Sequence, residues 1–454
     1  MADGAAGVAA GGVAPAWVGT VLNAEGRWAL RRKLPYLLGI MMLFDSWDSI
    51  VIAFALPAIA AEWNLGALQS GWLISAGYAG QLVGALVCGA IAETRGRLPV
   101  LRILVIVMSL LAIACGLAGD FGQLLAFRFV QGITIGGALP VSICYINEIA
   151  PAATRGRFFG TFQFLMLSGY GLASLVSAVV IPQWGWRPMF LMGALPLLFV
   201  PLLYRLPESP RWLAAQGRGD AARRALQRLG GDVPQELPEA EAAPAVAAPA
   251  RRVPVTDLFA PGLRGRTTTA VLLWFLTSLV SFGLVTWVPS IYVSNFGIPI
   301  AEALRYTAIA SVCIFGMPLL LRFTIDKIGR RPLPLAGTAI GGISLLVLTR
   351  IDPSAYQWLV VCTIIGQIGV SFSSMVLWPW TAEIYETRVR AVALGAASSL
   401  ARAASMLTPL VVGGLLALTG SILPVFMVFG FASISAALLW WLAAPETAGR
   451  QLDG

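Results

Sequence analysis

The sequence contains no histidine, only 12% charged residues, and five cysteines among its 454 residues. The absence of histidine removes the usual pH-sensitive side chain and a common metal ligand. The cysteines all lie in apolar stretches and lack the paired spacing of a disulfide framework or a metal site. They are Cys88, Cys115, Cys144, Cys313 and Cys362. No nucleophile constellation is visible, so we expect no metal, no cofactor and no enzymatic activity.

Long polar stretches are also scarce, since 58% of the residues are hydrophobic and the mean hydropathy is +0.80. Twelve apolar segments can each cross a bilayer, which takes about 20 residues. The segments are residues 34–60, 70–92, 98–118, 121–148, 158–181, 187–205, 267–292, 303–323, 332–349, 355–382, 391–418 and 421–443. The sequence therefore predicts an all-α membrane protein with twelve transmembrane helices.

The net charge of +9 is explained by topology and not by nucleic-acid binding. If both termini are cytoplasmic, 25 of the 31 lysines and arginines lie on the cytoplasmic side, as the positive-inside rule requires. The remaining six are Arg187, Arg305 and Arg350 outside, and Arg128, Arg322 and Arg402 in or at the edge of a span. This asymmetry predicts a multi-pass membrane protein with both termini in the cytoplasm.

A long polar interval separates the sixth and seventh segments and divides the chain into two halves. We expect a flexible cytoplasmic N-terminus (1–33), a six-helix bundle (34–205), a cytoplasmic linker (206–266), a second six-helix bundle (267–443) and a cytoplasmic C-terminus (444–454). The linker is rich in alanine, proline, arginine and glutamate, with one short amphipathic helix predicted near 218–229.

The halves repeat their charged loops. "AETRGRLP" (92–99) corresponds to "IDKIGRRP" (325–332), and "EIAPAATRGR" (148–157) corresponds to "EIYETRVR" (383–390). Such duplication is typical of carriers that rock two bundles around a central site. The predicted cytoplasmic gate consists of Glu93, Arg97, Glu148, Arg155, Asp326, Arg330, Glu383 and Arg390. The alternative is that these are ordinary interfacial charges that assist membrane insertion.

These motifs resemble the major facilitator superfamily. "GAIAETRGR" (89–97) is similar to its Gly-x-x-x-Asp-Arg-x-Gly-Arg signature, with Glu93 and Thr94 as departures, and "FRFVQG" (127–132) is similar to its Arg-x-x-Gln-Gly motif. "PESPRWL" and "PETAGR" resemble the branch that contains sugar porters, aromatic-acid/proton symporters and organic-ion transporters. The resemblance implies two pseudo-symmetric bundles, alternating access and a monomer. Together with the alanine- and arginine-rich, lysine-poor composition, it implies a place in a bacterial cell inner (cytoplasmic) membrane.

Within that branch, several absences narrow the resemblance. The seventh segment lacks the Gln-Gln pair and asparagine of hexose porters, and the fifth lacks the Gly-Pro motif of drug/proton antiporters. "DSWD" (45–48) looks like the Asp-Gly-x-Asp of aromatic-acid/proton symporters, with Ser46 in place of glycine. The resemblance therefore favours an aromatic-acid carrier.

Four intramembrane charges do not repeat between the halves. At an offset of about 234 positions, Asp45, Asp48, Arg128 and Arg402 have no charged counterpart. A buried charge is costly unless it faces a cavity or a partner, so we assign these four to substrate binding and coupling. The guanidinium of Arg402 has the planar geometry to bind a carboxylate bidentately. The alternative is that Arg402 forms a structural ion pair with an acid in the bundle.

Asp45 and Asp48 are three residues apart and share one helical face. Two acids this close in a low-dielectric site do not ionise together easily, which makes the pair the predicted proton site. The resemblance implies that Arg128 relays charge to it. The alternatives are a helix-capping role for the acids, or a structural pairing with Arg128.

Polar and aromatic side chains on several segments predict a cavity for a planar organic ligand. They are Trp47, Gln163, Tyr170, Gln367, Ser371, Ser374 and Trp378. The alternative for each is interhelical packing or a place in an interfacial aromatic belt.

The sequence therefore predicts a proton-coupled importer of a small organic anion, most simply an aromatic or heteroaromatic carboxylate. Its partners would be that anion, the proton and the lipid bilayer. Two alternatives remain: an organic-cation or drug/proton exporter, and a non-transporting sensor built on the same fold.

Overall fold

The computed structural model describes residues 16–24, 29–231, 233, 254–352 and 355–447. Helices form the twelve predicted segments, and the described part contains no β-strand. The segments are α2 (Ala29–Trp63), α3 (Ala67–Arg95), α4 (Arg97–Gly116), α5 (Phe121–Ile149), α6 (Arg155–Trp184), α7 (Arg187–Met192) with η2 (Leu195–Phe199) and α8 (Val200–Arg205), α11 (Arg264–Ser294), α12 (Ile300–Ile328), α13 (Pro332–Leu348), α14 (Tyr356–Ile384), α15 (Thr387–Thr419) and α16 (Leu423–Leu442). The predicted all-α membrane fold is confirmed.

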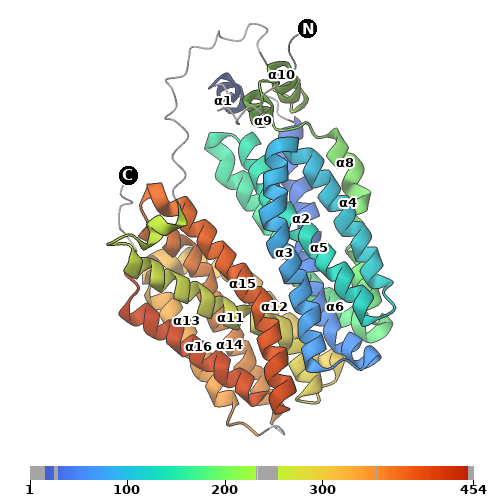
Figure 1. The fold of residues 1–454 in the computed structure, drawn as a ribbon, viewed down its shortest axis with the longest axis vertical. Coiled ribbons are helices and arrows are strands. Elements are labelled where there is room, and N and C mark those ends of the chain that lie inside the picture. The colour runs from blue at the N-terminus through green and yellow to red at the C-terminus, as the bar shows by residue number, and fades with distance from the viewer. Residues whose placement is uncertain (1–15, 25–28, 232, 234–253, 353–354, 448–454) are drawn as a thin grey trace, which may run out of the picture.

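Figure 1 shows two bundles side by side, α2–α8 in one half and α11–α16 in the other. The helices α1 (Ala16–Asn23), α9 (Pro210–Ala215) and α10 (Gly219–Arg228) lie together beyond one end of the first bundle. We call this the charged end, because the duplicated arginine-rich loops lie there, and the other the opposite end. The linker residues 234–253 lie outside the described part.

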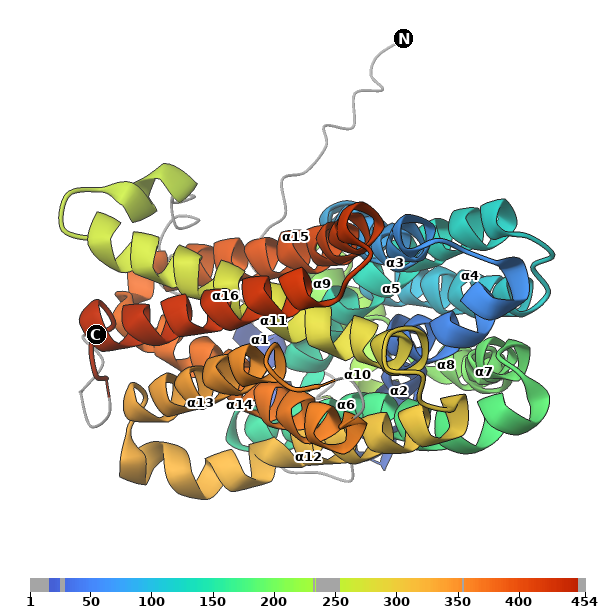
Figure 2. The same cartoon turned by 90° about the horizontal axis from the view of Figure 1, so that it is seen from below.

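The two halves meet most closely near the opposite end, where the ribbons of Figure 1 converge. Ser75 on α3 donates a hydrogen bond to the carbonyl of Met406 on α15 (2.8 Å). A Cβ atom at Gly71 would lie 2.6 Å from the carbonyl oxygen of Pro409, so only glycine allows this approach. Figure 2 shows α3 beside α15 and α6 beside α12. At this end, the described residues of the two halves are therefore joined by close backbone contact.

Within the first half, α3 and α5 also pack through glycine. A side chain at Gly84 would overlap the Ile133 carbonyl, and one at Gly132 would overlap the Gly77 carbonyl. Small residues let helix backbones approach closely in membranes, where packing replaces the hydrophobic effect as the driving force. This approach holds Arg128, one turn before Gly132, against α3.

The sixth segment is not one continuous helix. It consists of α7, the 3-10 helix η2 and α8, with the break at Gly193 and Ala194. Pro196 and Pro201 have no N–H and clash with the preceding turn, which explains why the α-helix does not continue. The break leaves space beside Gly193, and the side chain of Asp48 fills it, since a Cβ atom at Gly193 would overlap the Asp48 carboxylate.

The predicted flexible N-terminus is corrected in part, because residues 16–23 form the helix α1. Val18 and Leu22 are fully buried and belong to the same apolar cluster as Leu213 and Leu226 of α9 and α10. Burial of this apolar face provides the stabilisation that an isolated eight-residue helix lacks. The predicted amphipathic helix near 218–229 is confirmed as α10. Residues 1–15 and 448–454 lie outside the described part.

Candidate functional site

Four charges lack a counterpart in the other half, and the structure brings them from three helices to the centre of the molecule. Asp45 and Asp48 lie on α2, Arg128 on α5 and Arg402 on α15, which belongs to the other half. The side chains of Asp45, Asp48 and Arg128 are 4%, 0% and 1% exposed, so each has been removed from solvent almost completely. Such burial of ionisable groups inside spans is the strongest pointer to a functional site in this fold.

Arg128 is held by oxygen acceptors of its own half. Its Nη1 donates to the carbonyl of Asp48 (3.0 Å) and to Oε1 of Gln131 (2.8 Å). The guanidinium carbon lies 5.8 Å from the centre of the Phe190 ring. The predicted pairing with the acidic helix is therefore present, but the hydrogen bond reaches the Asp48 backbone and not its carboxylate.

The carboxylate of Asp48 has no hydrogen-bond donor within the described part of the chain, since both of its oxygens are buried and unpartnered. It lies against Gly193 at the break in the sixth segment. Arg128 is within electrostatic range of it. An ionised carboxylate is poorly solvated in such a place, whereas a protonated one is tolerated.

Asp45, Tyr170 and Arg402 form a cluster that crosses between the halves. Arg402 interacts electrostatically with both Asp45 and Tyr170. The Tyr170 hydroxyl also interacts with Ser46 and Ser49 beside the acids. Among described residues, however, no Arg402–Asp45 ion pair forms within 4.0 Å. The two charges therefore interact across the halves without forming an ion pair, so the alternative of a structural ion pair between them is not observed among the described residues.

Trp47 packs against the sixth segment in this structure. Its side chain is 2% exposed, and its indole N–H donates to the carbonyl of Met189 on α7 (2.9 Å). The bond anchors the sixth segment beside α2. The sequence could not distinguish a ring that packs on a neighbouring helix from a ring that faces a cavity, because an aromatic residue next to the acids suits both.

The four residues of the predicted polar stripe all lie on α14, but their surroundings differ. Gln367 is buried, and its Oε1 has no donor among described residues. Ser371 lies 3.5 Å from Ser281 of α11, and Ser374 bonds to the backbone of its own helix. Trp378 is half exposed and packs edge-to-face on Trp274 with ring centres 4.9 Å apart. Gln163 on α6 is half-buried.

Gly193 and Phe190 are site residues that the sequence analysis did not select. Both belong to the sixth segment, where they contact Asp48 and Arg128. The available signal was the interruption "MGALP" (192–196), because glycine- and proline-interrupted spans are the best sequence pointer to carrier sites.

At the charged end, the predicted gate residues form two separate ion pairs. Arg97 binds Glu148 (Nη2 to Oε1, 2.8 Å), and Arg330 binds Glu383 (Nε to Oε2, 3.2 Å). Each pair lies within one half. The charges thus fasten neighbouring helices of the same bundle in this conformation.

The other predicted gate residues lie outside these pairs. The exposed Glu93 accepts a bond from Trp212 through its carbonyl (2.9 Å), and Arg390 donates to the carbonyl of Tyr385 (3.3 Å). Arg155 is exposed at the start of α6. The side chain of Asp326 lies outside the described residues.

At the charged end, each half also has a glutamate that caps the N-terminus of a helix. Glu208 accepts a bond from the Leu98 N–H at the start of α4 (3.1 Å), and Glu446 accepts bonds from the N–H groups of Arg330 and Arg331 before α13 (2.9 and 3.0 Å). Carboxylates are favourable at helix N-termini. Burial raises the pKa of Glu208, although the backbone N–H bonds oppose that shift.

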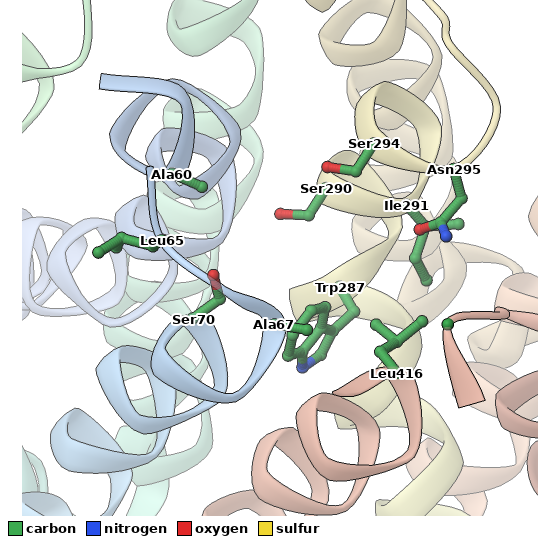
Figure 3. A pocket seen from close by; sticks show the side chains of 11 residues that line it. Ala60, Leu65, Ala67, Ser70, Trp287, Ser290, Ile291, Ser294, Asn295 and Leu416 are labelled. Carbon is green, nitrogen blue, oxygen red and sulfur yellow. The ribbon is translucent and has the colours of Figure 1, made fainter. Parts of the chain in front are cut away.

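A pocket of about 230 Å³ lies between the halves at the opposite end (Figure 3). Residues of the α2–α3 region face Trp287, Ser290 and Ser294 of α11 across it, and Leu416 of α15 closes one side. Its lining contains no charged side chain. It has no group that could neutralise an anion, so we assign the candidate site to the central charges.

The chain is similar to known transporters over most of its length. The niacin transporter NiaP of Acinetobacter baylyi is 29% identical over 436 residues, which cover 92% of this chain and 95% of that protein. The benzoate transport protein of the same organism is 26% identical over 415 residues, covering 88% of this chain and 86% of that protein. A solved D-xylose-proton symporter shares the fold, with a TM-score of 0.73 at 22% identity over 92% of this chain and 99% of that one.

The sequence profile of the family described as "Sugar (and other) transporter" matches residues 40–454. That range includes all four central charges and both bundles, apart from the part of α2 before residue 40. The chain therefore belongs to the sugar (and other) transporter family of the major facilitator superfamily, and it is a multi-pass membrane transporter and not an enzyme.

Proposed function

We propose that this protein is a proton-coupled importer of a small organic anion, an aromatic or heteroaromatic carboxylate. The observation behind the proposal is the arrangement of Asp45, Tyr170 and Arg402, in which opposite charges of the two halves face each other without an ion pair. When Asp45 is protonated, a carboxylate bound to Arg402 would neutralise the charge of the guanidinium. The Tyr170 ring beside it suits a planar ligand.

The acids would carry the proton. Asp48 is fully buried and has no hydrogen-bond donor for its carboxylate, so a bound proton would relieve the cost of burying its charge. Asp45, between Asp48 and Arg402, would respond to the substrate. Arg128 bonds the Asp48 backbone and would couple α2 to α5 when the proton leaves.

The named activities of the relatives support the substrate class. Niacin and benzoate are both small aromatic acids, and the proteins that carry them match this chain over most of their length. We propose that the charged end faces the cytoplasm of a bacterial cell, with both termini there, because most lysines and arginines lie at that end.

Alternating access would follow from rocking the two halves. We propose that the Arg97–Glu148 and Arg330–Glu383 pairs serve as the cytoplasmic gate, each exchanging its own partner for one in the other half when that end closes. The protein would work as a monomer.

The test is uptake into proteoliposomes under an inward proton gradient. Labelled nicotinate and benzoate are compared with D-xylose and a quaternary ammonium cation, for wild type, Arg402→Ala and the control Arg350→Ala. Arg350 is an exposed arginine of the α13–α14 loop. We expect an aromatic acid to accumulate, an uncoupler to abolish accumulation, and only Arg402→Ala to lose it.

Two outcomes would contradict the proposal. If only the cation moves, the acids of α2 form a cation site and the exporter alternative holds. If Arg402→Ala takes up the aromatic acid as well as wild type does, Arg402 is not the anion-binding group.

A further inference from the structure

A second basic site lies at the charged end, apart from the central charges. A cavity of about 820 Å³ opens between the first turns of α2 and α6, and the end of α1 and the α5–α6 loop complete its wall. Three arginines line it, Arg31, Arg32 and Arg157, together with the rings of Tyr36 and Phe158. The lining contains no aspartate or glutamate. The cavity is therefore positively charged and has the size of a small-molecule site.

The cavity exists because α2 and α6 diverge toward the charged end. Deeper in the bundle the two helices touch closely, since a side chain at Gly169 would overlap the Leu43 carbonyl, and a Cβ atom at Gly39 would lie 2.8 Å from Leu165. Toward the charged end, by contrast, Cβ atoms at Gly156 and Gly160 of α6 would meet open space. Arg31 is held by a bond from its Nη1 to the carbonyl of Leu22 (2.7 Å), which ties α1 to the rim.

In the second half, the place that corresponds to this cavity is filled by protein. Arg266 and Arg390 occupy the positions that correspond to Arg32 and Arg157. There, the helix η3 (Val255–Phe259) packs on α11 and α15, and its Leu258 is 2% exposed. Leu258 accepts a bond from Thr267 through its carbonyl (2.5 Å). The linker thus covers in the second half the position that stays open in the first.

The corresponding arginines of the two halves differ in the hydrogen bonds of their side chains. Arg266 donates to the carbonyl of Ile384 (3.3 Å), and Arg390 donates to that of Tyr385 (3.3 Å). Within the described residues, Arg32 and Arg157 form neither a hydrogen bond nor an ion pair through their side chains. Two guanidinium groups with open donors converge on one cavity, and their fork geometry matches phosphate oxygens.

We propose that this cavity binds the phosphate group of an anionic phospholipid from the leaflet at the charged end. Its place at the ends of two membrane-spanning helices is the level of lipid headgroups, where basic pockets between helices bind such lipids. Tyr36 is 56% exposed at the rim, as an interfacial aromatic residue would be. A bound lipid would bridge Arg32 on α2 and Arg157 on α6, the role that η3 has in the second half. The proposal does not depend on the identity of the transported substrate.

The experiment measures the melting temperature of the purified full-length protein in neutral detergent. Short-chain phosphatidylglycerol, short-chain phosphatidylcholine and inorganic phosphate are added separately. We compare wild type, the double variant Arg32→Gln/Arg157→Gln, and the control Arg224→Gln/Arg228→Gln. The control removes the same charge from exposed arginines of α10. Native mass spectrometry of lipid-bound protein is the second readout and does not depend on stability.

We expect phosphatidylglycerol to raise the melting temperature of wild type and the control, and to be retained on both in the mass spectrum. The double variant should lose at least half of the shift and most of the bound lipid. If the double variant keeps both, the cavity is not the lipid site. If inorganic phosphate gives the same shift as the lipid, the site takes soluble anions and the phospholipid proposal is wrong.

Discussion

The first half of the molecule contains Asp45, Asp48 and Arg128 inside its spans, whereas the corresponding positions of the second half are Leu279, Phe282 and Cys362. The second half contributes Arg402, whose counterpart in the first is Ser168. By contrast, the Arg–Glu pairs and the helix-capping glutamates at the charged end occur in both halves. The comparison separates charges that both halves share, which belong to a symmetric frame, from charges that occur once, for which we propose substrate and proton binding.

Removing a central charge should give the largest difference in transport between matched variants of the two halves. We expect Asp45→Asn to reduce proton-driven accumulation of the aromatic acid by at least about tenfold, equivalent to about 1.4 kcal/mol, since the variant cannot release a proton. The matched substitution in the second half, Leu279→Ala, should change it by less than about twofold. Uptake under a fixed gradient checks both. Equal losses in the two variants would show that the centre is not asymmetric.

The glycine contact between α3 and α5 is a packing difference between the halves. The positions 234 residues after Gly80 and Gly84 hold Ile314 and Pro318, so the second half lacks this pair. Gly84→Ala should lower the free energy of unfolding by about 1–3 kcal/mol, because the added methyl would overlap the Ile133 carbonyl. Gly414→Ala, which meets open space, is the control. A melting temperature of Gly84→Ala at or above that of the control would contradict this packing.

The duplicated ion pairs should respond alike. Glu148→Gln and Glu383→Gln each remove the charge from a partly buried bond to arginine, and we expect each to cost about 1–2 kcal/mol of stability. Thermal unfolding of the two variants, with Arg350→Ala as the surface control, tests the equivalence. A loss confined to one half would show that only one of the pairs supports its bundle.

The smallest expected effect concerns the cap of α4. Burial raises the pKa of Glu208, so the folded protein binds this proton more readily than the unfolded chain does. Stability from this group therefore increases as the pH falls through its folded pKa toward the ordinary value of glutamate. The melting temperature of wild type relative to Glu208→Gln should be higher at about pH 5 than at about pH 8. The opposite trend would mean that the backbone bonds outweigh burial.

The sequence by itself determined the number of spans, the two-bundle architecture and the helix α10, because hydrophobic length and repeated charge patterns are local properties of the chain. It also selected the four central charges, since an unrepeated intramembrane charge stands out without any knowledge of contacts. It did not determine the cavity residues, because an aromatic residue such as Trp47 next to the acids suits a ligand and a neighbouring helix equally well.

Only the tertiary structure decided which partners these side chains have. It set Arg402 opposite Asp45 without an ion pair, aimed Arg128 at the Asp48 carbonyl, and buried the indole of Trp47 against Met189. It also ordered α1 on α9 and α10, and opened a cavity at Arg32 and Arg157 where the second half is filled by η3. These features depend on how helices far apart in the sequence approach one another, and no local pattern of residues determines that approach.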